Sequence, residues 1–224
     1  MTWTDRDGKA LTDYPRPSVA VDVAVLTVRE QQLQVVVVPS ERGIALPGTF
    51  LRPSETLTEA AERALESKAN IVDLQFHQLK LFDEPGRDDR GWVLSMAHGA
   101  ATPSRSLPAT AESVAIDGVV PGSTLAFDHS EMVTEAVLDL RARYAREIDP
   151  AGFLDSTFTL LELRSLYEIV FDRAFSKDTF RRHVITALEG TSTTTTAGGG
   201  RPAELYRRAP DAALAASADS FLRG

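Results

Sequence analysis

The chain has 224 residues, of which 43% are hydrophobic and 25% charged, an ordinary composition for a globular protein with room for two domains. It has no cysteine, which excludes a disulfide framework and a thiolate metal site. No apolar run approaches the ~20 residues that a membrane span requires, and residues 1–17 lack the apolar core of a secretory signal. We therefore expect a cytoplasmic protein without a membrane partner.

The net charge of −8 is unevenly distributed along the chain. Residues 151–224 contain nine basic and nine acidic side chains, so the excess of acid lies in residues 1–150. Within residues 173–208, seven basic side chains stand against three acidic ones. An acidic front half thus precedes a locally basic module, a distribution that permits nucleic-acid binding by the rear half without requiring it.

Strand patterns surround a single clear helix in the first 120 residues. Alternating and β-branched residues predict strands at 17–28, 32–39, 74–82, 91–102 and 112–117. Thr56 and Glu59 have the T-x-x-E spacing of a capping box, which predicts the start of a helix over residues 57–69. This order of elements indicates an α+β domain.

A second helix marks the end of the front half. It is predicted to begin at Asp128, where Glu131 three residues later indicates another capping box, and to continue to about residue 146. Pro150 is expected to end it and to mark a domain boundary. We therefore divide the chain into residues 1–149, which include this linker helix at about 128–146, and residues 150–224.

The rear domain has the pattern of a helix-turn-helix followed by a hairpin. Thr159 and Glu162 form a third capping box, which begins a helix that ends at about residue 171. After a tight turn, Ser176 is expected to cap a second helix over residues 177–188. A Thr-rich run, a Gly triplet and "AELYRR" then predict the wing of a winged module, and the last residues are weakly helical.

The segment "ALPGTFLRPSETLTEAAERALESKANI", residues 45–71, resembles a Nudix box. That motif, G-x5-E-x7-R-E-U-x-E-E-x-G-U with U apolar, is the signature of pyrophosphohydrolases that act on nucleoside diphosphates linked to another moiety. Gly48, Glu55 and Arg63 remain as structural remnants of the box, and the resemblance implies an ion pair between the last two. The metal-binding glutamates are replaced by Ala64, Ser67 and Lys68.

The replaced positions decide whether the chain can be an enzyme. They lie within about 100° of arc on one helix face, because successive residues turn by about 100°. Three carboxylates there can hold Mg²⁺ against a diphosphate and help to activate water. This helix places a methyl, a hydroxyl and an ammonium there, while its own glutamates, Glu59, Glu62 and Glu66, lie on the other side. We therefore predict no functional Mg²⁺ site, no catalytic residue and no enzymatic activity.

Cationic side chains near the degenerate box are candidates for binding a nucleotide without cleaving it. The candidate ligand-binding residues are Arg52, Lys68, Arg87 and Arg90. An ammonium at position 68 can partly neutralise a diphosphate, although it can equally be a surface lysine. In proteins with a similar sequence, the loop that contains Arg87 and Arg90 lies near the ADP-ribose pocket.

The rear domain extends the resemblance to a regulator. Residues 158–188 and "GRPAELYRR" resemble the C-terminal winged helix-turn-helix of the Nudix-related transcriptional regulators, the NrtR family, and residues 125–144 resemble their linker helix. These proteins are bacterial repressors of NAD-biosynthesis genes that sense ADP-ribose or a related metabolite. The resemblance covers about residues 15–209. It implies a Nudix-like mixed-sheet α/β/α domain followed by a winged helix-turn-helix, and a homodimer on a palindromic operator.

The second rear helix would supply the contacts with double-stranded DNA, because such a helix enters the major groove. The candidate DNA-binding residues are Ser176, Lys177, Thr179, Arg181, Arg182 and, from the wing, Arg201. We expect one of Arg181 and Arg182 to face outward while the apolar side chains of the helix pack inward.

Other interpretations stay open at this stage. The front half is alternatively an unrelated α+β domain, or an active pyrophosphohydrolase that takes its metal ligands from Glu84, Asp88 or Asp89 and carries an accessory rear domain. Otherwise those acids form a solvated loop or contact a ligand. The basic rear half is alternatively a protein-binding module, which would make the chain a ligand-binding adaptor without DNA contact. The histidines at 77, 98, 129 and 183 are scattered, and we interpret them as packing or surface residues.

Overall fold

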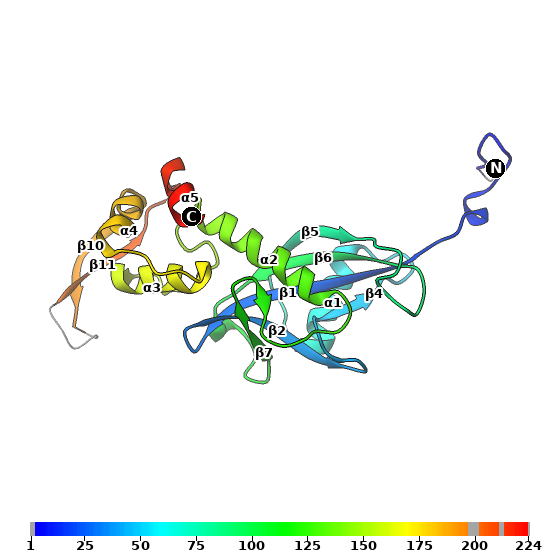
Figure 1. The fold of residues 1–224 in the computed structure, drawn as a ribbon, viewed down its shortest axis with the longest axis horizontal. Coiled ribbons are helices and arrows are strands. Elements are labelled where there is room, and N and C mark those ends of the chain that lie inside the picture. The colour runs from blue at the N-terminus through cyan, green and yellow to red at the C-terminus, as the bar shows by residue number, and fades with distance from the viewer. Residues whose placement is uncertain (1–2, 197–201, 211–212, 224) are drawn as a thin grey trace.

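The computed structural model describes residues 3–196, 202–210 and 213–223. Figure 1 shows a sheet-based front domain and a smaller rear domain, with helix α2 (His129–Tyr144) running between them. Residues 3–17 run out from the sheet ahead of its first strand. Within the described ranges, no helix combines the length and the apolar character that crossing a membrane requires.

The front domain is built on an eight-stranded sheet with the order β5-β6-β1-β2-β7-β8, to which β3 adds beside β2 and β4 beside β1. Its strands are β1 (Ser18–Arg29), β2 (Gln32–Ser40), β3 (Gly43–Ala45), β4 (Gly48–Phe50), β5 (Phe76–Phe82), β6 (Val93–Ala101), β7 (Glu112–Asp117) and β8 (Val120–Pro121). β1 and β6 run parallel, so the sheet is mixed. The five predicted strands are confirmed, whereas β3, β4 and β8 are too short to show an alternating pattern.

Helices cover both faces of this sheet, because side chains of its central strands alternate between two apolar sides. Helix α1 (Leu57–Ala69) packs on the side of β1 that carries Val21, Val23 and Val25. Helix α2 packs on the opposite side, where Ala24 and Leu26 lie. The predicted three-layer α/β/α arrangement is therefore confirmed.

The three predicted capping boxes have different outcomes. The Thr56 and Thr159 boxes are confirmed, since each hydroxyl accepts the backbone N–H three residues later and the returning glutamate accepts the threonine N–H. The Asp128 box is wrong: the structure gives this side chain no bond to its own helix, because its carboxylate pairs with Arg87 instead. Helix α2 also ends at Tyr144, well before Pro150.

The rear domain combines helices α3, α4 and α5 with a three-stranded sheet of order β10-β11-β9. Its elements are β9 (Phe158–Thr159), α3 (Leu160–Phe171), α4 (Lys177–Val184), β10 (Leu188–Thr195), β11 (Ala203–Arg208) and α5 (Ala216–Arg223). The predicted hairpin and the first helix are confirmed. The second helix was predicted too long: α4 ends at Val184, a 3-10 turn follows, and Leu188 already opens β10. Ser176 occupies the N-cap position, but its side chain makes no capping bond.

The two domains share one apolar core, which extends from the α2 side of the sheet into the rear domain. At the junction, the buried Asp149 carboxylate accepts hydrogen bonds from the Tyr144 hydroxyl at 2.6 Å and from the Phe153 and Leu154 amides at 2.9 and 3.0 Å. It also pairs with Arg208 on β11. The end of α2 is therefore tied to the rear sheet by charge as well as by packing.

Candidate functional site

A pocket of about 410 Å³ opens in the front domain beside the N-terminal end of α2. Its lining comes from β1, the β2–β4 region, α1, the loop at 84–91 and residues 127–129. Of the predicted ligand residues, Lys68, Arg87 and Arg90 line this pocket together. Arg52 does not: it lies exposed in the loop after β4, where its amide donates to Glu55. The structure thus brings together three of the four candidates.

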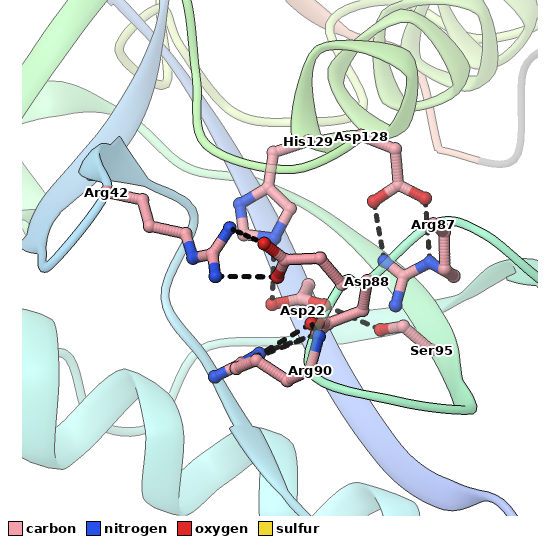
Figure 2. A network of polar contacts seen from close by, with 9 residues as sticks. Asp22, Arg42, Arg87, Asp88, Arg90, Ser95, Asp128 and His129 are labelled. Carbon is pink, nitrogen blue, oxygen red and sulfur yellow. Dashed lines mark hydrogen bonds and ion pairs between the residues drawn. The ribbon is translucent and has the colours of Figure 1, made fainter.

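Two arginines of this pocket are held by aspartates (Figure 2). Arg87 donates through Nε and Nη2 to Asp128 at 2.7 and 2.5 Å, and their side chains are only 5% and 16% exposed. Arg90 donates to Asp88 at 2.9 and 2.6 Å. The Arg90 guanidinium lowers the pKa of the Asp88 carboxyl to about 2. The expectation of a solvated loop is therefore wrong for Asp88, which is buried.

Aromatic rings and a third arginine form one wall of the pocket. The Arg90 guanidinium lies over Phe50 and Phe127, with 5.3 and 4.9 Å to the ring centroids. Arg42 lies over Phe127 at 5.2 Å and forms a bidentate pair with Asp89 at 3.1 and 2.6 Å. Flat rings and guanidinium groups of this kind offer stacking surfaces for a nucleobase.

A buried polar network forms the floor of the pocket. Ser95 Oγ donates to Asp22 Oδ2 at 2.6 Å, and the Leu46 amide donates to Nδ1 of His129 at 2.9 Å. Nε2 of His129 therefore carries the ring proton and faces Asp22 Oδ1 at 3.4 Å. Burial lowers the pKa of His129, which keeps the ring neutral at pH 7. The interpretation of His129 as a packing residue was incomplete, because it also lines the pocket.

Gly48 is required by this floor. A Cβ on Gly48 would lie 1.8 Å from Asp22 Oδ1, much closer than two non-bonded atoms can approach. Asp22 itself was missed by the sequence analysis, although it is the one charged residue in the apolar run 17–28. A lone charged residue within a predicted apolar strand is unusual, because charged side chains are rarely buried, and this was the signal that could have identified Asp22.

The Glu55–Arg63 ion pair is confirmed. Arg63 donates through Nε and Nη2 to the two carboxylate oxygens at 2.7 Å each, and through Nη1 to Thr49 Oγ1 at 3.0 Å. Its Nη2 also reaches the Phe50 carbonyl at 3.0 Å. The hydrogen bonds from Arg63 lower the pKa of Glu55 to about 2. The remnant of the box therefore fixes the shape of the loop before α1.

Helix α1 turns no carboxylate toward the pocket. Ala64 is buried, Ser67 Oγ donates back to the Arg63 carbonyl at 2.6 Å, and Lys68 lines the pocket. Glu62 and Glu66 line a separate depression, which residues 71–76 close on the other side. Across the described ranges, no three acidic or histidine side chains gather as metal ligands. Helix α1 therefore supplies no carboxylate to this pocket for the Mg²⁺ that the Nudix fold implies.

The outer face of α4 carries the DNA-binding candidates. Phe180 and Val184 are buried. The candidates Ser176, Lys177, Thr179, Arg181 and Arg182 are exposed or half-exposed, as are Asp178 and His183. Both arginines are exposed, which corrects the expectation that one would face outward. In the part of the chain that the structure describes, no carboxylate forms an ion pair with these three cations. Arg201 lies outside the described residues.

Comparison with known proteins connects both halves to one family. Residues 150–208 match the family model of the NrtR DNA-binding winged helix domain. The chain is 30% identical over 211 residues to the ADPR responsive transcriptional repressor NtrR of Acinetobacter baylyi, covering 88% of this chain and 84% of that protein. The crystal structure of Shewanella oneidensis NrtR complexed with a 27mer DNA superposes with a TM-score of 0.70 at 28% identity, over 86% of this chain and 94% of that one.

A shorter match involves an enzyme. The ADP-ribose pyrophosphatase of Methanocaldococcus jannaschii is 30% identical over 96 residues, which are 41% of this chain and 54% of that protein. The repressor match, in contrast, spans most of both chains. The fold of a Nudix-like domain followed by a winged helix is confirmed, and the interpretation as an unrelated α+β domain is excluded. The chain belongs to the NrtR family of transcriptional regulators.

Proposed function

We propose that the protein represses genes of NAD biosynthesis or salvage and responds to ADP-ribose or a related NAD-derived diphosphate. One observation carries this proposal: a single chain joins a pocket lined by arginines and aromatic rings, into which α1 turns no carboxylate, to a winged helix with an exposed basic helix. Its Acinetobacter relative is described as ADPR responsive, and its Shewanella relative was crystallised with DNA.

The pocket supports binding of a nucleotide diphosphate without hydrolysis. Lys68, Arg87 and Arg90 supply positive charge and N–H donors for phosphate oxygens. The guanidinium planes of Arg90 and Arg42, which lie over Phe50 and Phe127, offer stacking surfaces to a base. We propose that no Mg²⁺ takes part, since α1 presents an ammonium where the enzymes of this fold present carboxylates.

The rear domain supports operator binding. With Phe180 and Val184 packed inward, α4 presents its polar and basic face to the major groove. We propose a cytoplasmic homodimer whose two α4 helices lie about 34 Å apart, one turn of B-DNA, on a palindromic site.

The test measures DNA binding and turnover on the same preparation. Fluorescence anisotropy with DNA from upstream of the protein's own gene should show specific binding that ADP-ribose changes. Incubation of the protein with ADP-ribose and Mg²⁺ should release no AMP. AMP release at an ordinary enzymatic rate would show that the protein is a pyrophosphohydrolase. A failure to bind any upstream DNA fragment would favour a ligand-binding adaptor without DNA contact.

A further inference from the structure

Asp128 has two roles that compete for one carboxylate. It is the N-cap residue of α2, a position where an aspartate normally accepts N–H groups of the first helical turn. In this structure it makes no such bond, and both of its oxygens accept from Arg87 inside the pocket. Figure 2 shows the pair bridging the loop at 84–91 and the first turn of the helix. The pocket thus holds the side chain that α2 needs for its own cap.

We propose that the Arg87–Asp128 ion pair is the switch through which an anionic ligand acts on the linker helix. A phosphate group of the ligand takes the Arg87 guanidinium from Asp128, and the released carboxylate turns to cap α2. This inference rests on the proposed function, since it assigns the regulation of the same pocket.

The exchange replaces each lost partner with an equivalent one. Phosphate and carboxylate oxygens both fit the forked edge of a guanidinium, so Arg87 remains neutralised after the exchange. A partly buried carboxylate without a partner would be costly, but Asp128 finds N–H donors and the positive end of the helix dipole within its own helix. Two arrangements of similar free energy are what a switch requires.

The backbone at this point must move for Asp128 to become a cap. Asp128 has φ −94° and ψ 20°, whereas a capping residue normally adopts an extended conformation. Phe127, directly before it, has φ +55°, a left-handed conformation that is strained for a bulky residue. Ala126 is fixed by its bond to the Ile44 carbonyl at 2.8 Å. Residues 127 and 128 are therefore the point at which the backbone can turn between Ala126, which is bonded to β3, and the first turn of α2.

Movement of α2 reaches the DNA-binding helices through its other end. Arg141 donates from α2 to the Val170 carbonyl of α3 at 2.8 Å and to the Gly118 carbonyl of the front domain at 2.7 Å. The hydroxyl of Tyr167 on α3 donates to the Tyr144 and Glu147 carbonyls at 3.2 and 2.9 Å. A shift or rotation of α2 therefore changes the position of α3, and with it α4.

The test compares two isosteric substitutions at the same pocket. Asp128→Asn removes the charge that holds Arg87 yet keeps a side chain that caps helices well. Asp89→Asn removes the equivalent charge from Arg42, which has no bond to α2. Without ligand, D128N should bind the operator with the affinity that the wild-type protein shows at saturating ADP-ribose, and ADP-ribose should no longer change it. Its affinity for ADP-ribose by calorimetry should rise about tenfold, since Arg87 is free to bind. Arg42 also lines the pocket, so the affinity of D89N for ADP-ribose should change as well, but its operator binding should still respond once ADP-ribose saturates the pocket.

Hydrogen exchange on the wild-type protein provides a test that does not depend on a variant folding. The amides of Ser130 and Glu131, the two that an N-cap side chain can accept, should exchange more slowly when ADP-ribose is bound, because the cap has formed. Unchanged exchange there, a D128N variant that keeps the full response, or a D89N variant that loses it would overturn the switch. If the wild-type protein bound neither ADP-ribose nor inorganic pyrophosphate, the proposed function would fall as well.

Discussion

The arginines of the front pocket and the cations of α4 are arranged in opposite ways. Arg42, Arg87 and Arg90 are each held by an aspartate in bidentate geometry. On α4, no carboxylate of the described residues pairs with the cations. Fixed, partly neutralised donors accept only a ligand that can replace the aspartates, which favours selectivity. Surface cations without a carboxylate partner suit a duplex whose phosphates release counterions on binding, which favours affinity that depends on salt.

A third arrangement is the buried Asp149–Arg208 pair at the domain junction. Its removal should change the stability of the protein more than any other substitution proposed here. Asp149→Ala leaves the Arg208 charge and several donors without their acceptor, so the free energy of unfolding should fall by about 3–5 kcal/mol. Urea denaturation followed by circular dichroism measures it. Asp155→Ala, in the same segment but 83% exposed at its side chain, should change little. A D149A variant of wild-type stability would show that packing alone holds the junction.

Removing the cations of α4 should have the opposite effect: DNA binding should weaken while the stability of the fold is kept. Arg181→Ala with Arg182→Ala should weaken operator binding about tenfold to a hundredfold and reduce the slope of log K against log salt by about two. Its unfolding should match the wild-type protein, because both side chains are exposed. Arg223→Ala, an exposed arginine of α5 paired with Asp219, is the matched control. Unchanged operator affinity in the double variant would mean that α4 is not the recognition helix.

The same contrast explains what could be predicted from the sequence. The α1 helix and the boxes at Thr56 and Thr159 depend on residues three apart, so local pattern was enough. The box at Asp128 has the same spacing to its glutamate, with Asp in place of Thr, but failed, because Arg87, 41 positions earlier, takes the carboxylate. Local reasoning cannot weigh a distant partner against a nearby one.

The pocket shows this limit in more detail. Its floor joins Asp22 to Ser95 across 73 positions, a contact that depends on the parallel pairing of β1 with β6. Lys68, Arg87 and Arg90 were predicted from the family pattern, yet the aspartates that neutralise the two arginines were not. The resemblance identified the charges, and only the three-dimensional arrangement showed that Arg87 and Arg90 are already paired.

The Glu55–Arg63 pair tests whether an arginine held by a carboxylate stabilises the fold in a pH-dependent way. Its folded pKa of about 2 lies below the ordinary value of 4.5, so the pair stabilises the fold above about pH 4.5 and this contribution is lost as the pH falls toward 2. Glu55→Gln should therefore be less stable than the wild-type protein at pH 7, and the difference should shrink steadily between pH 4.5 and pH 2. Urea unfolding over this range measures it. A difference that stays constant down to pH 2 would contradict an ionic origin.

The smallest effect is expected at the exposed pair of the pocket rim. Arg42 and Asp89 are 44% and 68% exposed, so solvent screens their attraction, and Asp89→Asn should lower the free energy of unfolding by less than about 1 kcal/mol. The same substitution at Asp128 acts on a pair that is almost buried and attached to α2. D89N could prove as harmful as D128N, both to the free energy of unfolding and to the response to ADP-ribose. In that case the two ion pairs would not differ because of their burial or their attachment to the linker helix. The total charge at the pocket rim would then determine ligand binding, and the contrast between arginines paired with aspartates and those of α4 would have no physical basis.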